Sequence, residues 1–95
     1  MMGMDRIYIS WDCLIREAKD RFMEAIKEGV ETDLMTEIAL WLDYLLWEYA
    51  IPIVCEGIHE EWEIVDNESM WEYLDAMEYR IKREEEKIRK ELEEI

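Results

Sequence analysis

The sequence predicts an all-α protein, a single domain over residues 1–95 that folds as a bundle of about four helices. Three glycines and one proline leave little turn chemistry for an all-β fold. Glu, Lys, Arg, Leu, Ile and Met dominate the rest of the chain, and most of these residues favour helices. Apolar residues recur at steps of three and four along most of the chain. We expect helices at about 5–28, 33–50, 53–65 and 69–94.

The first helix has one apolar face, made by Trp11, Leu14, Ile15, Ala18, Phe22, Ala25 and Ile26. Its start is open, because Ile7 and Ile9 also suit a strand. Asp5 caps the helix, or residues 6–9 are extended and it begins at Ser10; we favour the earlier start. Gly29 is suited to end it.

The second helix is apolar nearly all round, since fourteen of the eighteen residues from 34 to 51 are apolar. A helix of this kind is buried on most sides. Asp43 near its centre argues against a membrane span, as does the absence of nearby flanking Lys or Arg. We therefore expect a homodimer that buries this helix against its mate. The expected interface residues are Trp41, Leu42, Leu45, Leu46 and Trp47.

The third helix is predicted from the helical spacing of Ile51, Val54, Cys55, Ile58, Trp62 and Val65, although Gly57 weakens it. Ser69 followed by Glu72 has the spacing of a capping box and begins the fourth helix. Past residue 80 its apolar stripe thins, and twelve of the last sixteen residues are charged. We expect this end to project as a charged arm, similar to the ion-paired helices of thermophile proteins.

The net charge of −15 is located entirely in the middle of the chain. Residues 1–27 hold five acids and five bases, residues 80–95 hold six of each, and residues 28–79 hold fifteen acids and no base. Such a surface repels phosphates, so direct binding of nucleic acid or of an anionic membrane is not expected.

Two rows of acids with helical spacing follow from the predicted third and fourth helices. Their members are Glu56, Glu60 and Glu63, then Glu68, Glu72 and Asp75. Each row places one charge every ~5 Å, and two such rows side by side would approach, without equalling, the charge density of a nucleic-acid backbone. These six residues predict a surface that docks on a basic protein partner. The sequence therefore favours a small interaction module, an inhibitor or regulator that imitates nucleic acid on a basic nucleic-acid-binding protein. A purely structural oligomerisation unit is a further alternative.

An enzyme is the competing interpretation. Glu28 with Glu31 and Glu72 with Asp75 form ExxE and ExxD pairs, and this order resembles the MazG-like nucleotide pyrophosphatases, which are small helical oligomers. The resemblance covers eight residues, and Glu28 and Glu31 flank a glycine rather than lying inside a helix. It implies a Mg²⁺-dependent nucleotide hydrolase, for which Asp43, Glu72 and Asp75 are the candidate ligands.

The cysteines and the histidine give no strong site. Cys55 and His59 have a spacing that can bind zinc, but a structural site needs four good ligands, and the chain holds three Cys or His in total. Two cysteines do not make a disulfide framework, and the chain shows no pattern of a cleavable signal peptide. We therefore expect reduced thiols, no cofactor and a cytoplasmic location.

Overall fold

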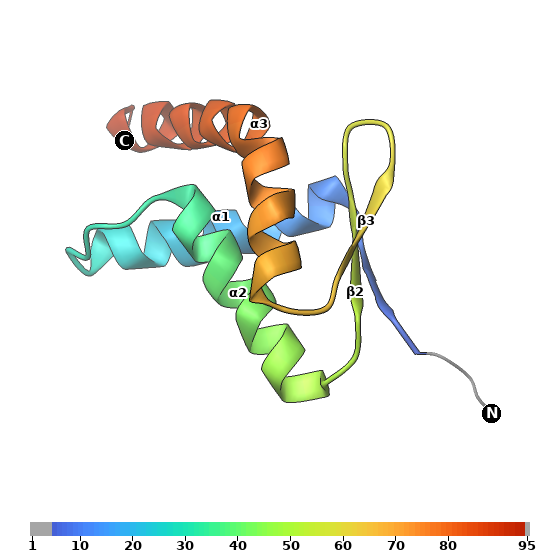
Figure 1. Ribbon diagram of the computed structural model, residues 1–95. Helices are drawn as coiled ribbons and strands as arrows, with labels where there is room; N and C mark the ends of the chain where they lie inside the picture. Colours follow the sequence, from blue (N-terminus) through green and yellow to red (C-terminus); the bar gives the residue numbers. More distant parts are fainter. Residues whose placement is uncertain (1–4, 95) are drawn as a thin grey trace.

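The computed structural model describes residues 5–94, which form three helices and a three-stranded sheet (Figure 1). In chain order the elements are β1 (Ile7–Ile9), α1 (Trp11–Lys27), α2 (Leu34–Tyr49), β2 (Ile53–Glu56), β3 (Glu61–Ile64) and α3 (Asn67–Glu93). The prediction of an all-α bundle of four helices is therefore wrong. The expected helix at 53–65 is a β-hairpin, and the start of the expected helix at 5–28 contains a strand.

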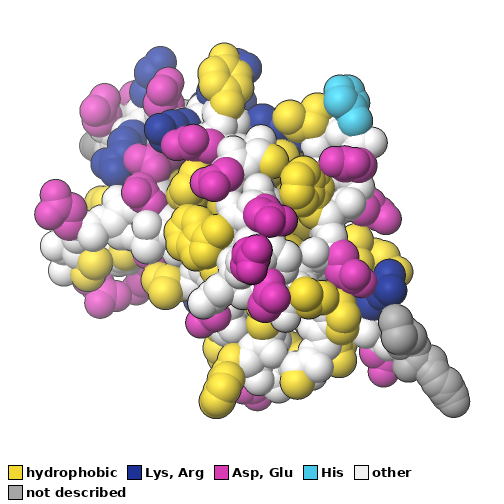
Figure 2. All heavy atoms as spheres, in the orientation of Figure 1, with side chains coloured by type: hydrophobic (Ala, Val, Ile, Leu, Met, Phe, Trp, Pro, Cys, Tyr) yellow, Lys and Arg dark blue, Asp and Glu magenta, His cyan; other side chains and the backbone are white. Residues whose placement is uncertain are grey.

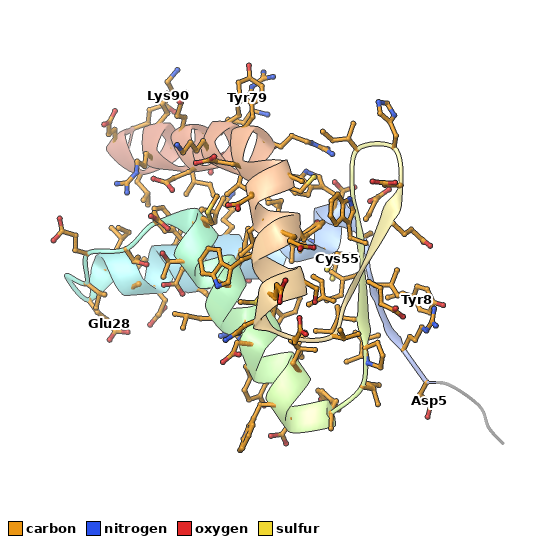
Figure 3. All side chains as sticks on the ribbon, viewed as in Figure 1. Asp5, Tyr8, Glu28, Cys55, Tyr79 and Lys90 are labelled. Atoms are coloured by element: carbon orange, nitrogen blue, oxygen red, sulfur yellow. The ribbon has the colours of Figure 1, made fainter. Side chains whose placement is uncertain are left out.

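The sheet has the order β1-β2-β3, with β1 parallel to β2 and β2 antiparallel to β3. Ile7, Ile53 and Ile64 are register partners on the face that meets the helices. Side chains alternate along a strand, so Tyr8 and Glu63 lie on the opposite face. Figure 3 shows Tyr8 pointing outward from β1, whereas Cys55 lies between the sheet and the helices. The sheet is thus packed on one face only.

The hairpin forms because residues 61–64 have a period of two rather than a helical period. Glu61 and Glu63 are exposed, whereas Trp62 is half-buried and Ile64 is fully buried. Trp62 also lies at helical steps from Ile58 and Val65, which is why the sequence predicted a helix. Gly57 begins the turn, and its N–H donates to the carbonyl of Glu60 at 2.8 Å.

Helix α1 takes the later of its two possible starts. The Ser10 side chain accepts the N–H of Cys13 and caps the helix, because residues 7–9 are committed to β1. The Glu56 carboxylate, at the end of β2, accepts the N–H of Trp11 at 2.7 Å. A strand that is distant in the sequence thereby satisfies a second free donor of this helix.

Helix α2 matches its expected range closely, with Asp33 as its cap. Its inner side holds Leu34, Ile38, Leu42 and Leu45, all buried in the core. The helix ends at Ala50, which adopts a left-handed conformation with φ 53° and donates its N–H to the carbonyl of Leu46. None of the helices in residues 5–94 has the combination of length and apolar character needed to cross a membrane.

Helix α3 begins two residues earlier than expected, with Asp66 as cap and Ser69 in the reciprocal position of the capping box. Figure 1 shows that its first half lies beside α2 and that its second half turns to run along α1. This second half is not a projecting arm, because Ile81 and Ile88 are buried in the core. Their wide spacing along the helix hid this packing from the sequence pattern.

Polar contacts attach the second half of α3 to the other helices. The Glu85 carboxylate accepts the N–H of Leu34 at the start of α2 and also pairs with Arg89. Lys19 of α1 pairs with Glu91 at 2.9 Å. The charged residues of the second half of α3 therefore pair with one another and hold this helix against α1 and α2.

Candidate protein-interaction surface

The hairpin separates the first expected row of acids. Glu56 is occupied by the N–H of Trp11, and Glu63 pairs with Arg6 at 3.2 Å across the outer face of the sheet. Glu60 lies in the turn between β2 and β3. Glu56 and Glu63 share the outer face of the hairpin, but they lie on different strands and Glu60 lies in the turn between them, so these three acids do not form a row.

The second row is kept, because Glu68, Glu72 and Asp75 all lie on α3 and are exposed. We call these three residues the acidic row. They lie opposite the buried side of the helix, which carries Met70 and Leu74. Figure 2 shows Asp and Glu side chains gathered along the first half of α3, with hydrophobic side chains on both sides of them. The bases visible in that view gather mainly over the second half of α3.

Ion pairing does not relieve the charge of the middle region. Residues 5–94 contain five salt bridges, and only two of them, Arg6–Glu63 and Lys82–Glu78, involve an acid from residues 28–79. No member of the acidic row takes part in any of the five. The structure therefore brings unneutralised carboxylates together on one side of α3.

An apolar face of α2 lies near this row. Leu40, Tyr44 and Trp47 are exposed by 58%, 51% and 85%. They are spaced by four and three residues, so they share the side of the helix that points away from the core. Large apolar side chains gathered on an exposed surface mark sites of interaction. The sequence could not show this face, because α2 is apolar nearly all round.

Two adjoining hollows run between α2 and the start of α3. The first is lined by Leu40, Asp43 and Trp71, among others, and the second by Asp43, Trp47 and Val65, among others. Each has a volume of about 290 Å³, and both are lined by Asp43 and Asn67. We call the two hollows together the apolar groove. Its remaining lining residues are Thr36, Ala39, Leu46, Asp66 and Met70.

Asp66 has a structural role at one end of this groove. The backbone N–H of Ser69 donates to its carboxylate and holds the pKa of Asp66 below its usual value. The side-chain hydroxyl of Ser69 acts in the same direction. The carboxylate therefore stays ionised at the rim of the groove near neutral pH.

The residues expected at a dimer interface lie in different environments. Leu42 and Leu45 are buried in the core of the single chain, and Trp41 and Leu46 are half-buried against that core. Trp47 alone among the five projects into solvent. The dimer itself stays a prediction, and the exposed side of α2 is the surface on which it would depend.

The metal candidates do not assemble into a site. Within residues 5–94 no group of three or more His, Cys, Asp or Glu is placed to hold a metal ion. The candidate ligands Asp43, Glu72 and Asp75 therefore do not form such a group. Glu28 caps the end of α1, and Glu31 lies in the following loop. Figure 3 shows Glu28 at the end of α1 that is remote from the sheet.

The Cys55–His59 pair is also separated by the hairpin. Cys55 lies on β2 with its side chain buried, and His59 is in the exposed turn. Burial raises the pKa of the Cys55 thiol to about 12. A thiol with that pKa is a poor metal ligand and a poor nucleophile near neutral pH.

A search of protein families, of curated proteins and of solved structures finds no match to this chain. We therefore infer its function from the residues and their geometry. The fold is a three-stranded mixed sheet covered on one face by three helices, and the candidate site is the acidic row together with the apolar groove.

Proposed function

We propose that this protein is a small acidic interaction module that docks on a basic surface of another protein. The observation that carries the proposal is the acidic row, three exposed carboxylates on successive turns of α3 without a salt bridge in residues 5–94. Exposed surfaces of soluble proteins usually intersperse both signs of charge. A basic partner would relieve the mutual repulsion of these carboxylates and would be steered toward them.

A nucleic-acid-binding protein is the partner that we favour. The row places one charge every ~5 Å along the helix axis, against one phosphate every ~3.4 Å along a DNA strand. An inhibitor or regulator with such a row occupies the Lys and Arg side chains that otherwise contact phosphates. We place this action in the cytoplasm, where an exposed thiol such as that of Cys13 stays reduced.

The enzyme interpretation has less support. Asp43, Glu72 and Asp75 form no metal cluster in the described part of the chain. The Mg²⁺ reaction inferred from the ExxE and ExxD pairs needs carboxylates that converge on one ion. A thermal melt with and without millimolar Mg²⁺ tests it directly, because a metal-binding enzyme would gain several degrees of Tm.

The docking function is tested by removing the charge of the row while keeping its shape. The variant Glu68→Gln/Glu72→Gln/Asp75→Asn is compared with the wild-type protein as bait for cell lysate at about 50 mM and about 500 mM salt. We expect the wild-type protein to retain a basic nucleic-acid-binding protein at low salt only. The recovered protein is then purified, and its Kd for both baits is measured.

The matched control removes three other exposed acids. Asp20→Asn/Glu24→Gln/Glu28→Gln makes the same change of charge on α1 and at its C-terminal cap, where Arg21 and Lys27 lie close in the sequence. We expect the row variant to weaken the purified complex by about tenfold or more and the control to change it little. Equal weakening by both variants would show that net charge, rather than the row, holds the partner, and would refute the proposed site.

A further inference from the structure

The apolar groove is a second feature beside the acidic row, and an interaction through charge alone would not involve it. It is bounded by Leu40 and Trp47 on one wall and by Trp71 and Val65 on the other, and Asp43 lies where its two hollows meet. All four apolar residues are exposed. A partner that bound only through charge would leave this surface in water.

The spacing of the exposed apolar residues on α2 matches the apolar repeat of an amphipathic α-helix. Leu40 and Trp47 are seven residues apart, which is about 10 Å along the axis of α2. An amphipathic helix repeats its apolar residues at i, i+3 or i+4, and i+7. The residues i and i+7 of a helix laid along the groove are therefore also ~10 Å apart, over two turns. Two hollows of about 290 Å³ each suit two such side chains better than one drug-sized molecule.

The charge of the groove selects the partner. Asp43 and Asp66 line it, the acidic row lies on the outward side of α3, and Glu48 follows Trp47 on α2. No Lys or Arg of residues 5–94 is among the residues lining either hollow. A second copy of this chain would bring an identical set of acids against this one, whereas a helix flanked by Lys and Arg would neutralise them.

We propose that the groove between α2 and α3 binds a basic amphipathic helix of the partner protein. The apolar residues of that helix fill the two hollows, and its Lys and Arg side chains reach Asp43, Asp66 and the acidic row. This inference rests on the proposed docking function and adds to it the form of the segment that is recognised. It also explains why Trp47 and Leu40 are left exposed beside unneutralised acids.

The probe is a fluorescently labelled peptide of leucine and lysine, about 18 residues or five turns long, with all leucines on one helical face. A second peptide of identical composition has its leucines spread around the helix, so it offers the same charge without an apolar face. Binding of both peptides to the whole protein is measured by fluorescence anisotropy. We expect the amphipathic peptide to bind the wild-type protein about tenfold or more tightly than the scrambled one.

Two variants locate the binding. Leu40→Ala/Trp47→Ala should remove the preference for the amphipathic peptide, whereas the control Tyr8→Ala/Ile58→Ala should keep it. Tyr8 and Ile58 are exposed by 67% and 55%, on the outer face of the sheet and in the hairpin turn, so the control removes similar apolar surface elsewhere. All substituted side chains are exposed, so both variants are expected to remain folded.

Each remaining outcome overturns a different statement. Equal binding of the two peptides that depends on the acidic row but not on Leu40 and Trp47 would refute the groove and leave the docking function standing. Failure of both peptides to bind would refute the docking function together with the groove. A dimer in sedimentation velocity that Leu40→Ala/Trp47→Ala dissolves would assign this face to a second copy and refute the basic helix.

Discussion

Replacing Gly57 by alanine distinguishes the observed hairpin from the helix that the sequence predicted, because the change in the free energy of unfolding has opposite signs in the two structures. In the middle of a helix, alanine is more favourable than glycine by about 1 kcal/mol, so the substitution would stabilise the protein. In the hairpin, Gly57 lies under the Trp62 ring and begins the turn. There the added methyl group has no room.

The structure sets the size of the cost. A Cβ at position 57 would lie 2.7 Å from both Cδ1 and Nε1 of Trp62 and 2.8 Å from the carbonyl oxygen of Glu60. That oxygen also accepts the N–H of Gly57 itself, so the turn cannot open without losing its hydrogen bond. Forcing a methyl group into such a site costs about 1–3 kcal/mol. Because Gly57 does not have a positive φ, the cost is steric rather than conformational.

The assay is urea unfolding followed by far-ultraviolet circular dichroism, which reports the helices rather than the environment of Trp62. With a slope of about 1–2 kcal/mol per M, we expect the midpoint of Gly57→Ala to fall by roughly 1 M. The exposed neighbour Ile58→Ala should stay within about 0.5 kcal/mol of the wild-type protein. A midpoint above that of the wild-type protein would show that residues 53–65 are helical and would refute the hairpin.

Three further predictions concern the packing and the pH dependence of the fold. Ile88 is 3% exposed, so Ile88→Ala should lower the free energy of unfolding by about 2–4 kcal/mol. If its effect were as small as that of Lys90→Ala, a substitution of an exposed residue, the second half of α3 would project from the protein. Burial raises the pKa of Cys55 from 9.0 to about 12, so between these values the unfolded chain releases a proton that the folded chain keeps. The stability that this group contributes is fully present below pH 9 and should fall by about 1.4 kcal/mol per pH unit above pH 9. In urea titrations at alkaline pH, Cys55→Ala should flatten this loss of stability, whereas Cys13→Ala should not. Glu56→Ala removes the acceptor for the N–H of Trp11 and should lower the stability measured by thermal melt by about 1–2 kcal/mol. Peptide binding should be unchanged, and a loss of binding would instead place Glu56 in the interface.

The local signals in the sequence located the three observed helices, but they also predicted a helix at 53–65 where the structure has a hairpin. The apolar steps in α1 and the place of Ser69 in a capping box depend on residues within one or two turns. Ser69 does take part in the cap of α3, although its partner is Asp66 and not the expected Glu72. The separation of charge is likewise a property of the sequence, because residues 28–79 encode fifteen acids and no base, and the fold brings bases from outside only to Glu63 and Glu78 among the described residues.

The sheet could not be predicted in this way, because strands need partners. Ile7–Ile9 is short enough to fit either a strand or the first turn of a helix, and its register partner Ile53 lies more than forty residues away. Residues 61–64 alternate between exposed and buried positions, and this period of two was the missed signal. Trp62 also lay at helical steps from Ile58 and Val65, so the local pattern alone could not decide.

The sequence by itself indicated the three helical segments, together with a fourth that is a hairpin, and it determined that the middle of the chain is uniformly acidic, since these follow from neighbouring residues and from composition. Tertiary structure decided which residues of α2 remain outside. In a helix that is apolar nearly all round, only packing against α1, α3 and the sheet leaves Leu40 and Trp47 exposed while Leu42 is buried. That choice sets the apolar groove beside the acidic row, and it depends on contacts between residues far apart in the chain.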